Sequence, residues 1–93
     1  MKARALVAWN VRRIRVNRGI PQELLAHDAR INRSYMGGIE QQSANPTIDV
    51  LDRIAGALDV DLSEFFVQPP KGATPPMTLR RGPKPAHPRR KQN

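Results

Sequence analysis

The chain has 93 residues, with sixteen Lys and Arg against eight Asp and Glu and a formal net charge of +8. That length allows one small domain whose core self-association would help to stabilise, and the lack of cysteine excludes disulfides, thiolate nucleophiles and thiolate metal sites. The apolar run ALVAW is soon followed by Arg12 and Arg13 and is too short for a signal peptide or a membrane span. We therefore expect a soluble protein of the cytoplasm with no membrane contact.

The positive charge is unevenly distributed along the chain. Residues 1–67 carry nine basic and eight acidic side chains, whereas residues 68–93 carry seven basic side chains and no acid. Within the first segment, residues 1–41 hold eight basic and three acidic residues, and residues 42–67 hold one and five. This distribution predicts that residues 1–41, and not the acid-rich segment that follows, face a polyanion.

Helical periodicity predicts five short helices and no strand, so the expected fold class is all-α. The first helix covers about residues 3–18 and ends at Gly19, which supplies a left-handed stop. Its predicted core stripe consists of Val7, Val11, Ile14 and Arg18.

The other helices are predicted from their starting residues. The second begins at Pro21 in the run PQELLAHDA, and Asn32 caps the third, which covers about residues 32–41. After the polar loop QQSANP, the run TIDVLDRIAGAL forms the fourth. Its predicted core residues are Ile48, Leu51, Ile54, Ala55 and Leu58. The run DLSEFF forms the fifth, with Asp61 and Glu64 arranged like a capping box.

Only residues 29–31 separate the second and third helices, which is the spacing of a helix-turn-helix, in which the second helix of the pair can lie in the DNA major groove. A longer ordered set of positions agrees with this spacing: Val11, Arg12, Arg15, Gly19, Gln22, Glu23, Leu25, Ala26, Ile31, Asn32, Arg33, Ser34, Tyr35, Met36, Ile39, Glu40, Asn45, Pro46, Leu51, Ile54, Ala55, Leu58, Val60, Asp61, Leu62 and Phe65. Across residues 6–67 the sequence resembles the phage-repressor and Cro type of helix-turn-helix domain. The resemblance implies a compact five-helix domain that binds operators as a homodimer.

The resemblance also implies a set of DNA-contacting residues. Gln22 matches a contact at the backbone edge of the groove, and the alternative is a solvated surface amide. Arg33 and Ser34 match positions that reach base edges. An arginine there can pair with guanine O6 and N7, which contributes about 1–3 kcal/mol of discrimination, or it can hold a phosphate instead. Tyr35 could contact DNA or pack against the scaffold. The full expected set is Gln22, Arg30, Asn32, Arg33, Ser34, Tyr35, Gly38 and Ser43.

Arg15 and Glu40 match a charged pair that ties the first helix to the end of the recognition helix in this family. Both residues lie on faces that otherwise look buried, so each needs the other. The sequence departs from the family pattern at the turn, where Arg30 replaces the usual glycine, so that either Arg30 adopts a positive φ or the turn differs from that of the family. Pro21 replaces the usual Ser or Thr cap of the second helix.

Two consecutive glycines, Gly37 and Gly38, fall inside the recognition helix and outside its expected core stripe. Together they cost the helix about 1–2 kcal/mol relative to alanine. Gly38 stands where the family places a long polar base reader. The pair either permits close approach of the backbone to DNA or reflects relaxed selection, and both interpretations predict weak or narrow base specificity.

Residues 68–93 contain seven of the nine prolines and are expected to form a disordered basic tail. This tail could lie along DNA, fold on a protein partner or only solubilise the chain. The folded domain is expected to end at residue 67. Phe65 and Phe66, just before this boundary, are candidates for a dimer interface, or both could close the monomer core.

The sequence offers no set of residues arranged for catalysis, because His27 lacks a nucleophile at a recognisable spacing and His87 lies in the tail that is expected to be disordered. No phosphate-binding glycine loop and no metal-ligand spacing occurs in the sequence, so no cofactor and no metal is expected. We therefore predict a transcriptional regulator that binds double-stranded DNA as a homodimer, in the cytoplasm of a bacterium or encoded by a phage, and associated with the nucleoid. The alternative is an antitoxin or partner-bound module with secondary DNA binding.

Overall fold

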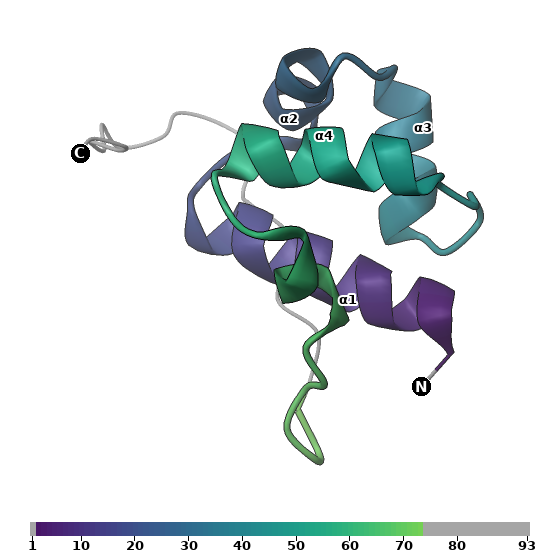
Figure 1. Cartoon of the computed structure of the whole chain (residues 1–93), viewed down its shortest axis with the longest axis vertical. Helices are drawn as coiled ribbons and strands as arrows, with labels where there is room; N and C mark the ends of the chain where they lie inside the picture. Colours follow the sequence, from purple (N-terminus) through teal and green to yellow (C-terminus); the bar gives the residue numbers. More distant parts are fainter. Residues whose placement is uncertain (1, 74–93) are drawn as a thin grey trace.

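The computed structural model describes residues 2–73, which form four α-helices and one short 3-10 helix (Figure 1). The elements are α1 (Ala3–Asn17), α2 (Gln22–Ala29), α3 (Arg33–Glu40), α4 (Ile48–Leu58) and η1 (Leu62–Phe66). No strand occurs within residues 2–73, so the all-α prediction is confirmed for this range. Most of the predicted basic tail, residues 74–93, lies outside the described residues.

The prediction of a fifth α-helix was wrong, because the fifth element is the 3-10 helix η1. It is only five residues long, and the Asp61 side chain makes no capping hydrogen bond. The turn is closed instead by the backbone, with Glu64 N donating to Asp61 O at 3.0 Å. A run this short adopts the tighter 3-10 geometry.

The helices enclose one core. α2 packs against α4 and α3, while α1 packs against α3 and η1. In Figure 1, α3 crosses steeply relative to α1 and α4, so it closes one side of the bundle. The core residues are Val7, Val11, Ile14, Leu25, Ala26, Ala29, Met36, Ile39, Leu51, Ile54, Ala55, Leu58 and Phe65.

Two residues predicted to face the core do not. Arg18 is exposed, because it is the C-cap of α1 and lies beyond the part of the helix that its neighbours cover. Ile48 is 63% exposed, because it is the first residue of α4 and follows the exposed cap residue Thr47. Conversely, Leu6 and Ala8 are buried, since α1 is covered by both α3 and η1 and therefore buries more than one stripe.

Each α-helix is followed by one residue in the left-handed region. These residues are Gly19, Arg30, Gln42 and Asp59, with φ of 68°, 61°, 67° and 60°. The left-handed stop predicted at Gly19 is confirmed, and of the two alternatives for Arg30 the structure shows the positive φ. A left-handed conformation costs a non-glycine residue on the order of 1 kcal/mol.

Candidate nucleic-acid interface

The turn between α2 and α3 has a well-defined geometry. Arg30 takes the left-handed conformation at φ 61° and ψ 44°, which redirects the chain. Two residues later the Asn32 side chain accepts a hydrogen bond from Tyr35 N at 2.9 Å, which confirms Asn32 as the cap of α3. Pro21, by contrast, gives α2 no side-chain cap, as expected. The turn therefore fixes the direction of α3 relative to α2.

The first turn of α3 is open to solvent. Asn32, Arg33 and Ser34 are all exposed, which is the exposure that contact with a duplex requires. Tyr35 is half-buried and packs against the core, so the structure favours the scaffold interpretation for this ring. Arg33 and Ser34 are therefore the exposed side chains in the first turn of α3.

The predicted pair of Arg15 and Glu40 is present and buried. Arg15 Nε donates to Glu40 Oε2 at 2.6 Å, and Arg15 Nη2 donates to Glu40 Oε1 at 2.9 Å. The exposed fractions of the two side chains are 2% and 3%. Arg15 Nη1 also donates to Ile20 O at 2.8 Å. The pair joins α1 to the last residue of α3, so it fixes the position of α3 relative to α1.

Gln22 belongs to the same network. Its Nε2 donates to Glu40 Oε1 at 3.1 Å, and the residue is half-buried at the start of α2. Gln22 is therefore not a free solvated amide, and its side chain already has a partner within the protein. The carboxylate uses one amide hydrogen, while the amide has a second hydrogen and a carbonyl oxygen. Gln22 therefore links α2 to α3.

The two glycines of α3 differ from the prediction. Gly37 is buried, so the expectation that it lies outside the buried stripe of the helix was wrong. A Cβ there would lie 3.2 Å from Arg33 Nη1, which shows that the arginine side chain lies beside this glycine. At Gly38 a Cβ would lie 3.2 Å from Ala44 Cβ and 3.3 Å from Ser43 Oγ. The close approach that Gly38 permits is thus made by the chain's own loop.

The loop after α3 is held against this glycine. Ser43 N and Ala44 N both donate to Gly38 O, at 2.8 and 3.1 Å, and Ser43 Oγ approaches the same oxygen at 3.4 Å. Ser43 and Gln42 remain exposed on the loop. The closeness of the loop could not be predicted from the sequence, because it depends on the left-handed conformation of Gln42, which the residue type does not indicate.

Asn10 is a structural residue that the sequence analysis missed. It is 0% exposed, and its Nδ2 donates to Phe65 O at 3.0 Å and to Val67 O at 2.8 Å. Its Oδ1 accepts a hydrogen bond from Arg13 Nε at 3.1 Å. The available signal was an asparagine in an otherwise apolar stretch of the first helix. Asn10 fixes the chain on both sides of Phe66.

Phe65 and Phe66 have opposite environments. Phe65 is 0% exposed because it lies in the core, so the prediction that it belongs to a dimer interface was wrong. Phe66 is 42% exposed. Because Phe65 and Phe66 are adjacent in the sequence and of the same type, the sequence did not indicate which of the two rings would enter the core.

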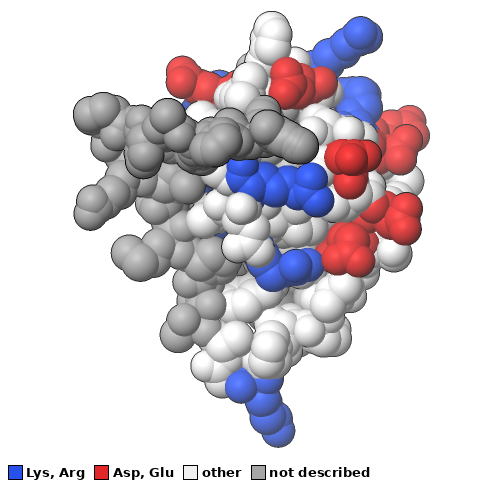
Figure 2. Space-filling model, turned by 90° about the vertical axis from the view of Figure 1, so that its left-hand side faces the viewer, with Lys and Arg blue, Asp and Glu red and all other residues white. Residues whose placement is uncertain are grey.

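Acidic and basic side chains lie close together on part of the surface. Figure 2 shows a face on which most of the acidic side chains gather toward the right-hand side, with basic side chains beside them. Among residues 2–73 no group of three or more His, Cys, Asp and Glu could hold a metal ion. No helix in the described part of the chain is long and apolar enough to cross a membrane.

Comparison with known proteins relates this geometry to a family. A family model described as helix-turn-helix (HTH_3) matches residues 11–65. The chain is 33% identical over 66 residues to a hypothetical transcription factor from Neisseria meningitidis serogroup B, a match that covers 71% of this chain and 62% of the relative. It is 37% identical over 57 residues to the immunity repressor protein of Bacillus phage phi105, covering 61% of this chain and 40% of that protein. The chain thus spans less than two thirds of each of these relatives.

Solved structures give the same result. The crystal structure of the hypothetical transcription factor NHTF from Neisseria matches with a TM-score of 0.71 at 32% identity and covers 73% of this chain and 78% of that one. The restriction-modification controller protein C.AhdI from Aeromonas hydrophila matches with a TM-score of 0.66 at 32% identity and covers 68% of this chain and 96% of that one. With its capped turn, its buried pair and residues 11–65 inside the family model, the chain belongs to the helix-turn-helix family of the phage-repressor and Cro type.

Proposed function

We propose that the chain is a transcriptional regulator that binds double-stranded DNA sequence-specifically, with α3 in the major groove. The relatives named above are transcription factors, repressors and controller proteins, not enzymes. The observation that carries the proposal is the buried network of Arg15, Glu40 and Gln22, which holds α1, α2 and α3 together while Arg33 and Ser34 stay exposed. A fixed helix with open leading side chains is what base reading requires.

Within this proposal the residues divide by role. Arg33 reads a base edge, with guanine as the partner that suits a guanidinium. Ser34 assists, since a hydroxyl can donate or accept. Arg30, exposed in the turn, holds a phosphate. Gln22 keeps one amide hydrogen on Glu40 and offers the other to the DNA backbone.

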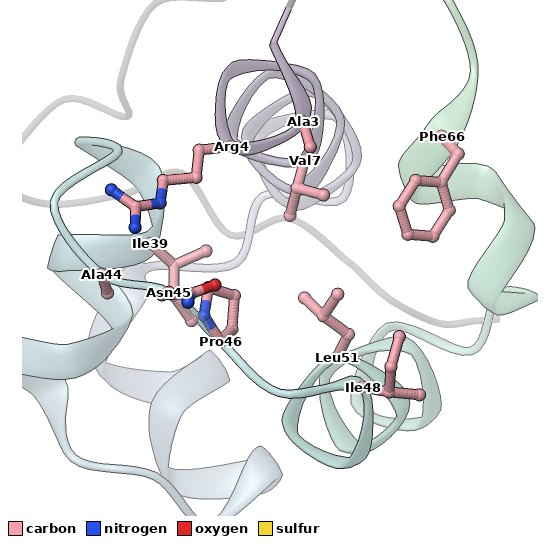
Figure 3. Close-up of a pocket in the computed structure, with 10 residues that line it drawn as sticks. All are labelled: Ala3, Arg4, Val7, Ile39, Ala44, Asn45, Pro46, Ile48, Leu51 and Phe66. Carbon is pink, nitrogen blue, oxygen red and sulfur yellow. The ribbon is translucent and has the colours of Figure 1, made fainter.

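The proposed assembly is a homodimer on two half-sites about one helical turn apart. Phe66 and Ile48 are large apolar residues that the monomer leaves exposed, at 42% and 63%. They line a hollow of about 140 Å³ with the start of α1 and the loop before α4. Figure 3 shows the Phe66 ring on one side of this hollow and Asn45 and Pro46 on the other. A two-fold interface presents the same patch from both copies, so this surface suits a second copy.

Selection of bound duplexes from a random DNA pool at a fixed salt concentration tests the function. We expect an enriched palindrome whose half-sites are about one helical turn apart. Enrichment of no sequence would contradict sequence-specific binding and favour a module whose principal partner is a protein.

A further inference from the structure

The outer face of α1 carries apolar side chains that the core does not use. Ala5, Trp9 and Val16 follow one another at intervals of four and seven residues, which places them together on the side of the helix that points away from the core. All three are partly buried, and within residues 2–73 none of them belongs to the core or to the apolar residues packed against it. An indole in this position can pack against a further segment.

The same face holds a polar atom without a partner. Arg12 lies three residues after Trp9 and four residues before Val16, so the three side chains are neighbours on the helix. Arg12 Nε is buried and makes no hydrogen bond within the described part of the chain. Because a buried donor without an acceptor is unfavourable, this position suits a segment that brings a carbonyl oxygen. Ala5, Trp9, Arg12 and Val16 are called the Trp9 face below.

The chain leaves the domain beside this helix. Asn10 Nδ2 of α1 donates to Val67 O at 2.8 Å, which holds the end of the folded domain against α1. A few residues later, a hydrogen bond from Ala73 N to Pro70 O at 3.0 Å and a φ of 78° at Gly72 form a tight turn. Figure 1 shows the coloured chain reversing its direction in this turn, below α1. The turn directs the chain that follows back toward the domain.

The chain that follows has two parts of different composition. Residues 73–79, with the sequence ATPPMTL, carry no charge and contain the large apolar residues Met77 and Leu79. Residues 80–93 carry six Lys and Arg, no acid and no large apolar residue. Only the first part therefore has apolar side chains that packing against an indole would remove from water.

Charge and backbone conformation also favour the uncharged part as the occupant of the Trp9 face. Basic side chains flank Trp9 on α1, and they repel a basic segment but not residues 73–79. Pro75 and Pro76 favour the extended polyproline conformation, which packs against aromatic side chains and makes no internal hydrogen bonds. Its carbonyl oxygens are therefore available to Arg12 Nε.

We propose that residues 73–79 pack against the Trp9 face, with the side chains of Met77 and Leu79 on the indole and a backbone carbonyl on the unpaired guanidinium nitrogen. The inference goes beyond the proposed function, because the contact needs no DNA. Its consequence is that the basic residues 80–93 start from a fixed point on α1.

The test uses the fluorescence of the full chain without DNA, since Trp9 is its only indole. The unchanged chain is compared with the double variant Met77→Ser and Leu79→Ser, and with the control Arg89→Ser and Arg90→Ser. The first variant should lower the ratio of docked to undocked chain about tenfold, because both apolar side chains are lost. We therefore expect its emission to shift to longer wavelength and its quenching by acrylamide to increase, whereas the control matches the unchanged chain.

A second measurement detects the contact itself. The chain has no cysteine, so Thr78→Cys provides one site for a bimane label, whose fluorescence an indole quenches on contact. We expect quenching that Trp9→Phe abolishes. The same label at Asn93→Cys is the control and should not be quenched, because residue 93 lies far along the chain from the docked segment.

Two results would overturn the inference. One is Trp9 emission and quenching that the exchange of Met77 and Leu79 leaves unchanged, or a bimane signal at residue 78 that is the same with and without the indole. The other is protection of Trp9 that is lost on dilution, because a second copy of the chain would then cover this face. The proposed function stands in either case.

Discussion

Glu40 accepts three hydrogen bonds from two side chains, two from Arg15 and one from Gln22. A buried carboxylate is costly unless its oxygens are satisfied, and these bonds satisfy both oxygens from helices other than its own. The same bonds place α3 against α1 and α2. One residue therefore serves the stability of the fold and the position of the proposed DNA-reading surface.

Replacing Glu40 with glutamine should destabilise the domain strongly. Glu40→Gln keeps the shape of the side chain but leaves the Arg15 guanidinium buried without a counter-charge, which costs about 3–5 kcal/mol. Urea denaturation measures the free energy of unfolding. Ser34→Ala is the control, because an exposed serine should change that energy by less than about 0.5 kcal/mol. Equal stabilities of the two variants would show that the pair does not hold the fold.

At the scale of elements, α3 and α4 begin in the same way. Asn32 Oδ1 accepts from Tyr35 N at 2.9 Å, and Thr47 Oγ1 accepts from Val50 N at 3.0 Å. Both caps satisfy a backbone N–H that the helix itself leaves unpaired. Only the first of these helices belongs to the proposed DNA interface.

The two caps form a matched pair of variants. Asn32→Ala and Thr47→Ala should each cost about 1 kcal/mol of stability. Asn32→Ala should also weaken DNA binding, since it loosens the leading turn that carries Arg33, while Thr47→Ala leaves affinity nearly unchanged at a temperature where both variants are folded. Thermal melting and duplex titration measure the two effects. Equal losses of affinity would mean that binding only reports overall stability.

Helix starts and stops could be predicted from the sequence because local chemistry decides them. Asn32 caps α3 through its own side chain, and Gly19 turns the chain after α1 because it tolerates a positive φ. The Arg15–Glu40 pair could be predicted from the resemblance to the family. These features depend on residue type more than on distant neighbours.

Features that depend on tertiary neighbours could not be predicted. Ile48 follows the core spacing of α4 but is exposed, because it is the first residue of that helix and follows the exposed cap residue Thr47. The sequence predicts that Gly38 faces the groove, but the loop at Ser43 and Ala44 packs against this glycine. Gln42 carries no local signal for a left-handed conformation, which the chain adopts because the loop must fold back onto α3.

For the molecule as a whole, Asn10 connects the core to the proposed dimer surface. Its amide holds the backbone at Phe65 and Val67, and the ring of Phe66 projects from the segment between them. The Phe66 ring is therefore presented from a rigid backbone. A fixed apolar side chain loses little entropy when a second copy covers it.

Phe66→Ala should weaken the proposed dimer without unfolding the monomer. A partly exposed ring contributes little to the core, but a hot-spot aromatic residue can contribute about 2 kcal/mol or more to an interface. Analytical ultracentrifugation over a concentration series measures the dissociation constant. Phe65→Ala is the contrasting variant and should lower stability by about 3–5 kcal/mol, because its ring is fully buried. An unchanged dissociation constant for Phe66→Ala would place the dimer interface elsewhere.

The most direct measurement of the central claim, that α3 reads base pairs from its leading end, is a comparison of the duplexes selected by the unchanged chain and by Arg33→Ala. Arg18→Ala, an exposed arginine outside α3, is the control. We predict that Arg33→Ala loses the preference for guanine at one position of each half-site, by about 1–3 kcal/mol, and keeps the rest of the selected sequence. A uniform loss of affinity on all sequences, equal to that of Arg18→Ala and with the selected sequence unchanged, would contradict base reading by α3.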